Sequence, residues 1–498
     1  MPKFLKNKII SIPFILLILI LILGAFFRLY RINEYMIFLG DEGRDVLVVK
    51  RMLVDHIFTL LGPITSVGSM YMGPVYYYMM APALLLANFN PVGPSIMVAL
   101  FSTATIFLIY YLASRYFSQR AGLIAAFFYA ISPLSIMQGR SSWNPNAIPF
   151  FSTLMMICLF KVIIDKKYNY LFYAGLLFGV LIQLHYTSLY LLIVLIAALI
   201  LTKTKVTLKS IVFFIIGSII TFSPFLTFEL RHDFTNTRAV IHFLTTGSEM
   251  QGLNSLGMFH TFADVLVRIF WRLLIIESAE IAKIAIVFTL GILAYMLIKR
   301  EKTKAVTILL VWLFGGILSF MFYGGVIYDY YFVGMFAVPF IIWGIFIDKI
   351  FKIKKIGLWT GVILILSVAA FNFKQSPILN QPSNMVGNTQ TIARFVYDKV
   401  DHKPYNFALI AGHNSDHAYR YFLELWGAAP VTIQNPVIDP QRKSVTDDLY
   451  IVCEEKVCKP LGHPLWEIAG FGPAEIADEW KVSTARVLHL VRYKGDQK

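Results

Sequence analysis

Long apolar runs separated by short connections are the feature that most constrains this chain. A membrane-spanning helix needs about 20 apolar residues to cross roughly 30 Å of hydrocarbon at 1.5 Å per residue. By that test about eleven runs are long enough, so the sequence predicts an α-helical polytopic membrane protein. The predicted spans are 9–27, 94–114, 121–137, 147–164, 170–184, 186–202, 211–228, 281–298, 305–323, 331–347 and 356–372.

The composition agrees with a membrane protein and gives its orientation. Hydrophobic residues make up 57% of the 498 residues, charged residues only 15%, and the net charge is +15. Such a positive charge could indicate nucleic-acid binding, but the basic residues gather in alternate connections, as cytoplasmic loops do. We therefore predict no nucleic-acid partner, and a multi-pass cell-membrane protein with a cytoplasmic N-terminus. The clusters are Lys3, Lys6 and Lys8; Arg115 and Arg120; Lys166 and Lys167; Lys203, Lys205 and Lys209; Lys299, Arg300, Lys302 and Lys304; Lys349, Lys352, Lys354 and Lys355.

Residues 373–498 have an ordinary soluble composition, and the same alternation places them outside the cell. We therefore divide the chain into a membrane domain, 1–372, and an extracytoplasmic α/β domain, 373–498. Periodicity within the second domain predicts helices and strands but no nucleotide-binding motif. The predicted helices are 391–400 and 417–426, and the predicted strands are 407–411, 449–452 and 485–491.

Two adjacent carboxylates, Asp41 and Glu42, follow the first predicted span in the stretch Phe-Leu-Gly-Asp-Glu-Gly-Arg-Asp, 38–45. Apolar residues then recur at helical spacing from Val46 to Leu60, which predicts an amphipathic helix lying on the membrane surface. One interpretation is that Asp41 caps this helix. The other is that a partly desolvated carboxylate at a membrane face is held ready to act as a base or to bind a cation.

A second apolar run, 75–86, lies in the same outer loop, 28–93, and is too short to span. It is predicted to be an interfacial or re-entrant helix, or a loop that packs on the bundle. Polar and aromatic groups occupy the other outer connections, and they are candidates for substrate binding because they share one side of the membrane. With Arg44, these candidates are Trp143, Asn144, Asn146, His185, Tyr186, Glu229, Arg231, His232, Asp329 and Tyr331.

Cys453 and Cys458 lie in the predicted outer domain at a spacing that a tight turn can close. A disulfide would suit an oxidising compartment. Two free thiols are the alternative, because so short a loop gains little closure entropy.

Four features together resemble the GT-C membrane glycosyltransferases. They are the Asp41-Glu42 pair after the first span, two juxtamembrane helices, the element Trp143-Asn144-Pro145-Asn146, and the late connection Tyr328-Asp329-Tyr330-Tyr331. The nearest branch resembles the dolichyl-phosphate-mannose protein mannosyltransferase group, glycosyltransferase family 39, and the lipid A aminoarabinose transferase. The resemblance covers most of 1–372 and is architectural beyond it.

The resemblance implies transfer of a sugar from a polyprenyl phosphate to a protein, lipid or glycan acceptor on the outer face, with Asp41 as the catalytic base and Glu42 as its neighbour. Two departures stand out. Relatives often carry an acidic residue before the fourth span, where this chain has Asn144 and Asn146. Some carry Glu-Lys-Pro before the second span, where this chain has Met-Gly-Pro at 72–74.

One carboxylate is enough for sugar transfer from a polyprenyl phosphate. A glycosyl phosphate leaves as a phosphate monoester whose second pKa is about 6, so its departure needs no protonated acid. The acceptor does need a base, and the phosphate needs positive charge, for which Arg44, Arg231 and His232 are candidates. A divalent metal ion is left open as a cofactor.

Two other functions remain open from the sequence. One is a transporter or flippase for a lipid-linked or glycan substrate, although the chain shows no internal repeat of the kind that transporters often have. The other is a non-catalytic assembly or binding protein whose activity lies after residue 372. Both alternatives predict that the activity survives loss of Asp41.

Overall fold

The computed structural model describes residues 11–66, 69–246, 255–412 and 414–493, so Lys3, Lys6, Lys8 and the start of the first predicted span lie outside the described residues. The chain forms two compact units. We call Met1–Tyr30, Thr59–Met79 and Ser95–Gln381 the helical unit, and Arg31–Phe58, Met80–Pro94 and Pro382–Lys498 the sheet unit. The sheet unit thus contains 31–58 and 80–94, which, except for residue 94, belong to the predicted outer loop, 28–93. The division at residue 372 stays a prediction.

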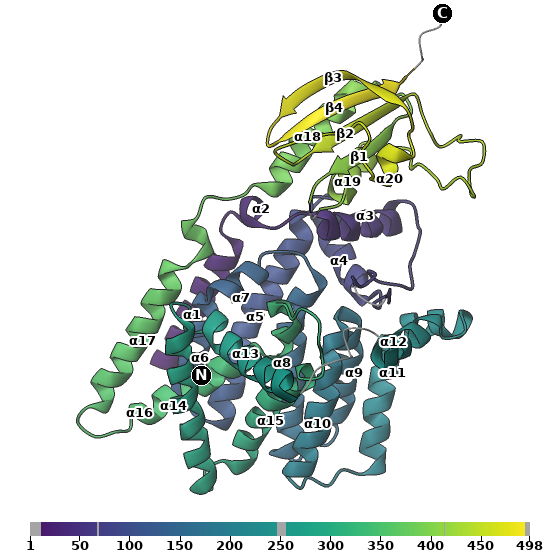
Figure 1. Ribbon diagram of the computed structural model, residues 1–498. Coiled ribbons are helices and arrows are strands. Elements are labelled where there is room, and N and C mark those ends of the chain that lie inside the picture. The colour runs from purple at the N-terminus through teal and green to yellow at the C-terminus, as the bar shows by residue number, and fades with distance from the viewer. Residues whose placement is uncertain (1–10, 67–68, 247–254, 413, 494–498) are drawn as a thin grey trace, which may run out of the picture. The chain divides into compact units, whose positions relative to one another are not determined.

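The helical unit consists of α-helices joined by short connections and 3-10 turns (Figure 1). Its elements are α1 (Ile12–Leu29), α5 (Val92–Tyr116), α6 (Gln119–Ile131), α7 (Pro133–Gln138), η1 (Asn144–Ala147), α8 (Ile148–Ile163), α9 (Tyr170–Leu184), η2 (Tyr186–Leu189), α10 (Tyr190–Leu201), α11 (Leu208–Arg231), α12 (Thr235–Thr246), α13 (Ser255–Leu273), α14 (Ala279–Ile298), α15 (Thr303–Phe320), η4 (Asp329–Met335), α16 (Ala337–Ile350), α17 (Gly357–Lys374) and η5 (Pro377–Leu379).

Each predicted span coincides with a helix or a pair of consecutive helices. Seven helices among the described residues are long and apolar enough to cross a membrane, and η4 with α16 gives an eighth if this pair, bent by 57°, is one span. The remaining predicted spans fall on shorter apolar helices, Gln119–Ile131, Tyr170–Leu184 and Tyr186–Leu201. The predicted polytopic α-helical fold is therefore confirmed.

Short helices flank the acidic motif, as the sequence predicts. They are α2 (Ile32–Tyr35), α3 (Gly40–Val54) and α4 (Val75–Leu86), and α4 carries Pro82 in its interior. Helix α3 ends at Val54, so the predicted helix, whose apolar spacing runs to Leu60, is shorter than expected. Val46 and Val49 are buried, and α3 contacts α19 (His417–Leu425). That the apolar face of this helix lies on the membrane surface stays a prediction.

The sheet unit is built around a four-stranded mixed sheet of order β1-β2-β4-β3. Strands β1 and β2 are parallel, and the other pairs are antiparallel. Helix α18 contacts α19, β3 and β4. The elements are α18 (Met385–Val400), β1 (Asn406–Ile410), α19, β2 (Asp448–Cys453), α20 (Trp466–Ala469), β3 (Ala474–Val482) and β4 (Ala485–Arg492).

Strand β3 was not predicted, and its sequence explains why. The central strands β1 and β2 are buried almost throughout, which gives the apolar runs that sequence analysis detects. Strand β3, Ala-Glu-Ile-Ala-Asp-Glu-Trp-Lys-Val, is mostly exposed at the edge of the sheet, and it is a strand because β4 pairs with it. An exposed edge strand carries charge and lacks an apolar signature.

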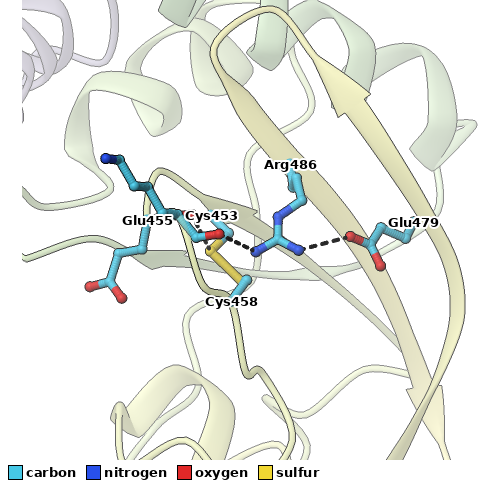
Figure 2. The surroundings of a disulfide bond; sticks show 6 residues. Cys453, Glu455, Cys458, Glu479 and Arg486 are labelled. Atoms are coloured by element: carbon cyan, nitrogen blue, oxygen red, sulfur yellow. Dashed lines mark hydrogen bonds and ion pairs between the residues drawn. A yellow bond between two sulfur atoms is a disulfide. The ribbon is translucent and has the colours of Figure 1, made fainter.

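The structure joins Cys453 and Cys458, which confirms the predicted disulfide (Figure 2). The bond closes the turn at the end of β2. Beside it, Arg486 of β4 donates one hydrogen bond to Glu479 (3.3 Å) and another to the carbonyl oxygen of Lys456 (3.4 Å). The end of β2 is therefore held by a covalent bond and by contacts with β4.

Candidate functional site

The acidic motif forms the first turn of α3, and Glu42 rather than Asp41 caps this helix. Leu39 precedes the helix, and its backbone N–H donates to Oε2 of Glu42 at 3.0 Å. This is one half of a capping box. Asp41 is the second residue of the helix, a position where its negative charge complements the helix dipole. The interpretation of Asp41 as the cap is therefore wrong.

Asp41 is the exposed member of the motif. Its side chain is 54% exposed, and Arg44 donates to its Oδ1 at 2.8 Å. The guanidinium of Arg44 also contacts Oδ1 of Asp45, at 2.8 and 3.0 Å, and the side chain of Asp45 is fully buried. A buried carboxylate thus fixes the arginine, and the arginine fixes the direction of the Asp41 carboxylate.

The desolvated carboxylate expected at this motif is that of Glu42. Burial raises the pKa of Glu42 to about 7, and the negative charges of Asp41 and Asp45 act in the same direction, whereas the hydrogen bond from Leu39 opposes them. A carboxyl group with such a pKa changes its protonation near neutral pH. The two adjacent acidic residues therefore have different properties, since one is accessible and the other is buried and titrates near neutrality.

His417, at the start of α19, is a neighbour of the motif that sequence analysis did not single out. Burial lowers the pKa of His417, and among the charges that act on it are those of Arg44 and Asp41. Its Nδ1 lies 2.8 Å from Oγ of Ser415. No motif in the sequence marks this histidine, because its proximity to Asp41 depends on the packing of α3 on α19.

In the helical unit, three connections between helices meet in an aromatic cluster. Trp143 contacts Tyr330 with ring centroids 4.6 Å apart. The ring of His185 lies 5.7 Å from that of Tyr330 and 5.5 Å from that of Tyr331. Tyr328 stacks on Tyr330 at 5.6 Å. The structure therefore brings together the predicted site residues Trp143, His185 and Tyr331, which the sequence placed on one side of the membrane.

Asp329, at the start of η4 beside this cluster, is clamped by two arginines of α13. Arg268 donates to Oδ1 through Nε at 3.2 Å and through a terminal nitrogen at 2.5 Å. Arg272 donates to Oδ2 at 3.0 Å. Arg268 also lies over the ring of Phe332, 5.3 Å from its centroid. Sequence analysis missed both arginines, because only the fold brings α13 to η4.

The amides of Asn144 and Asn146 are buried and bind backbone. Asn144 donates to the carbonyl oxygen of Leu184 and lies 3.1 Å from the sulfur of Met72, whereas Asn146 donates to the carbonyl oxygen of Ser141 at 2.9 Å. Asn144 thereby ties η1 to the end of α9, next to His185. A substrate-binding role for these residues stays a prediction.

Glu229 and Tyr186 belong to one buried network that holds α12. The Glu229 carboxylate accepts the backbone N–H groups of Asn236 (3.1 Å) and Thr237 (2.7 Å), which lie in the first turn of α12. The side chain of Asn236 donates to the hydroxyl of Tyr186 at 2.8 Å, and Tyr186 donates in turn to the carbonyl oxygen of Tyr71. These contacts make Glu229 the cap of α12.

Arg231 and His232, the other predicted phosphate contacts, are exposed at the end of α11. The ring of His232 stacks on Phe228, and its Nδ1 lies 2.9 Å from that residue's carbonyl oxygen. The structure does not bring them to the aromatic cluster through any described contact. Within the described ranges, no group of three or more His, Cys, Asp or Glu side chains could hold a metal ion.

Comparison with known proteins supports the resemblance seen in the sequence. Residues 72–228 match the model of the family described as dolichyl-phosphate-mannose-protein mannosyltransferase. No curated protein matches the sequence. The family match covers the end of the outer loop and the helices from α5 to α11, and it leaves the acidic motif at 41–42 outside.

Solved structures with a similar fold cover most of the length of the chain. ArnT from Cupriavidus metallidurans, bound to undecaprenyl phosphate, has a TM-score of 0.66 at 11% identity over 97% of this chain and 98% of that one. The oligosaccharyltransferase AglB from Archaeoglobus fulgidus, in complex with an inhibitory peptide and a dolichol phosphate, has a TM-score of 0.50 at 11% identity over 89% and 69%. An oligosaccharyltransferase from Archaeoglobus fulgidus, tethered to an acceptor peptide, gives a TM-score of 0.51 at 12% identity over 88% of this chain and 68% of that one.

At these identities the likeness shows the fold alone. The fold is similar to that of ArnT and AglB, and the part of the chain that the structure describes has seven or eight candidate spans and a small C-terminal sheet. Together with the family match, it supports a membrane glycosyltransferase of the GT-C type.

Proposed function

We propose that this chain transfers a sugar from a polyprenyl-phosphate donor to an acceptor hydroxyl or amine on the outer face of the cell membrane. Its N-terminus would be cytoplasmic and residues 373–498 extracytoplasmic. Two findings support the donor class: the match to the mannosyltransferase family, and the likeness to an ArnT that binds undecaprenyl phosphate and an AglB that binds dolichol phosphate. The acceptor is a protein, a lipid or a glycan, and mass spectrometry of the product would distinguish these three classes.

The observation that carries the mechanism is the contrast between the two carboxylates of α3. A general base must come within hydrogen-bond reach of the proton it removes. Asp41 is half exposed and held in place by Arg44. Glu42 is buried, and its carboxylate is engaged with the backbone of Leu39. We therefore assign the base to Asp41 and a supporting role to Glu42.

The reaction requires one proton transfer to Asp41. The bond between the anomeric carbon and the phosphate oxygen breaks, and its electron pair leaves with the phosphate. The acceptor oxygen or nitrogen bonds to the anomeric carbon and passes its proton to Asp41. The leaving phosphate needs no general acid, because its second pKa is about 6.

In the helical unit, we assign donor recognition to the aromatic cluster and to Arg268 and Arg272. Aromatic faces suit prenyl chains and sugar rings, and guanidinium groups suit phosphate. This assignment replaces Arg231 and His232, which no described contact joins to the aromatic cluster. Arg44 remains a candidate cation beside Asp41.

The test compares cells that lack the gene with cells that carry the parent gene or the Asp41→Asn variant. Mass spectrometry of lipid-linked sugars and surface glycans provides the readout. We expect the deletion and the variant to accumulate the same polyprenyl-phosphate sugar and to lose the same glycan. If the Asp41→Asn protein restores the glycan fully, the assignment of the base to Asp41 fails, and the transporter and the binding protein become the alternatives.

A further inference from the structure

One backbone N–H group in the first turn of α3 donates its hydrogen bond to a distant part of the chain. The first N–H groups of a helix have no acceptor within the helix. The N–H of Leu39 is satisfied locally by Glu42. The N–H of Gly40, the residue directly before Asp41, donates instead to Oδ1 of Asn414 at 2.8 Å. Asn414 lies 374 residues further along the chain.

The amide of Asn414 is itself fixed on both sides. Its Oδ1 also accepts the N–H of Ser415 at 2.9 Å. Its Nδ2 lies 3.1 Å from each carboxylate oxygen of Glu454, and the hydroxyl of Tyr419 donates to the same carboxylate at 2.7 Å. Glu454 directly follows Cys453 at the end of β2. The direction of the amide oxygen is thus set by the sheet.

Two glycines let α3 approach this segment closely. A Cβ on Gly40 would lie 2.0 Å from Oγ of Ser415 and 2.8 Å from its backbone nitrogen. A Cβ on Gly43 would lie 2.3 Å from the backbone nitrogen of Ala418. Neither position leaves room for a side chain. The backbone of the acidic motif therefore rests directly on the segment that leads into α19, and a shift of one would move the other.

Other described contacts hold the chain on either side of this first turn. Before the helix, the rings of Phe38 and Phe422 lie 5.9 Å apart. Near the other end, Arg51 donates to both oxygens of Glu424 at 3.1 and 2.8 Å, and Lys50 lies 3.2 Å from the same carboxylate. Loss of Asn414 would therefore loosen the turn that carries Asp41 and leave the rest of the helix docked.

We propose that Asn414 is a positioning residue that aims the Asp41 carboxylate by holding Gly40 to the Glu454 side of the sheet. The proposal rests on the proposed role of Asp41 as the base. The C-terminal α/β fold would then contribute to the reaction, because Glu454 at the end of β2 orients the Asn414 amide, which binds the first turn of α3.

The matched variants are Asn414→Ala and Asn388→Ala. Asn388 also joins two segments of the sheet unit through its side-chain amide, to Ser383 (3.1 Å) and Ser483 (3.0 Å). The substrate is the polyprenyl-phosphate sugar that accumulates in the deletion cells. We expect Asn414→Ala to lower kcat roughly 10- to 100-fold with the donor KM nearly unchanged, because misplacing a catalytic group costs rate rather than binding. Asn388→Ala should leave both constants near the parent values.

A double variant that exchanges the hydrogen-bond donor and acceptor between positions 414 and 454 should restore turnover. Asn414→Asp alone should be as slow as Asn414→Ala, because it removes the donor to Glu454 and adds a like charge. Adding Glu454→Gln supplies an amide that donates to the new carboxylate, which can still accept from Gly40. Recovery of kcat in this double variant is expected, and a double variant as slow as Asn414→Asp would contradict the proposal.

Two further measurements distinguish a failure of the positioning role of Asn414 from a failure of the assignment of Asp41 as the base. Amide hydrogen exchange of the peptide 37–45 should be faster in Asn414→Ala than in the parent or in Asn388→Ala. In an Asp41→Asn background, Asn414→Ala should slow turnover no further. The positioning role is overturned if Asn414→Ala slows turnover as much in the Asp41→Asn background as in the parent. It is also overturned if Asn414→Ala has the kcat of the parent while Asp41→Asn is inactive.

If Asp41→Asn itself transfers at the parent rate, the base assignment fails and Asn414 is only a cap of α3.

Discussion

Two carboxylates that the sequence placed among the site residues, Asp41 and Asp329, have opposite surroundings. Asp41 is 54% exposed, and its one partner among the described contacts, Arg44, engages Oδ1. Asp329 is 20% exposed, and arginines engage both of its oxygens. A carboxylate held on both oxygens by guanidinium groups is poorly placed to accept a proton, whereas one with an accessible oxygen can act as a base. The comparison teaches that exposure and the number of partners distinguish two acidic residues that look equivalent in sequence.

The largest effect is expected for Asp41→Asn. The substitution keeps the size of the side chain and an oxygen that Arg44 can contact, but it removes the base. Turnover should fall by roughly 10²–10⁴-fold, as is typical for loss of a general base. Purified protein assayed with the accumulated lipid-linked sugar measures this. Asp398→Asn is the matched control, since Asp398 is also exposed (57%) and pairs with an arginine of its own helix. A stable Asp41→Asn protein that transfers at the parent rate would remove the distinction between the two carboxylates.

Glu42→Gln should change how stability depends on pH. Because the folded state raises the pKa of Glu42 from 4.5 to about 7, folding favours the protonated form. The stability that this group contributes is fully present below about pH 4.5 and is lost as the pH rises to about 7. Glutamine keeps the oxygen that accepts from Leu39 and stays neutral.

The free energy of unfolding of Glu42→Gln relative to the parent should therefore rise between pH 5 and 8 by on the order of a few kcal/mol, and its Tm should rise with it. Thermal unfolding in detergent at a series of pH values is the measurement. Glu479→Gln, at an exposed position, serves as the control. A Tm difference that does not change with pH would mean that Glu42 is ionised throughout.

Asp329→Asn should mainly cost stability. The variant leaves Arg268 and Arg272 without their shared charge partner, and charge-assisted hydrogen bonds contribute about 1.5–3 kcal/mol each when well shielded from solvent. Because Arg272 is 45% exposed, we expect a total loss of roughly 1–3 kcal/mol and a smaller loss of turnover than for Asp41→Asn. Parallel Tm and kcat measurements on the two variants provide the check. An Asp329→Asn protein with parent Tm and abolished kcat would reverse the roles of the two residues.

The smallest effect is expected for Arg231→Ala. This side chain is exposed at the end of α11, and surface substitutions usually change stability by no more than about 0.5 kcal/mol. The donor KM should stay near the parent value, whereas Arg268→Ala should raise it. Steady-state kinetics of both variants with the same donor would decide between them. A raised KM for Arg231→Ala alone would restore the phosphate role that the sequence suggested.

Much of the candidate site could be predicted from local sequence. The pair at 41–42 begins a helix after the first span, as predicted, because acidic residues favour the first turn and apolar spacing marks the remaining turns. The grouping of Trp143, His185 and Tyr331 agrees with their shared side of the membrane. Which carboxylate is buried and which is exposed could not be predicted, since both stand at adjacent positions of one turn and the packing around them decides.

The sequence by itself determined the helices at the predicted spans, the helix that begins at the acidic motif and the strands β1, β2 and β4, because each depends on a run or a period of apolar residues that a short segment contains. It did not determine that this helix ends at Val54. Tertiary structure alone decided the rest. Arg268 clamps Asp329 across 61 positions of the chain, and Asn414 holds Gly40 across 374. Such contacts join single polar groups, and a single polar group has no periodicity. Only the fold, by excluding water and bringing these groups within hydrogen-bond distance, determines their partners.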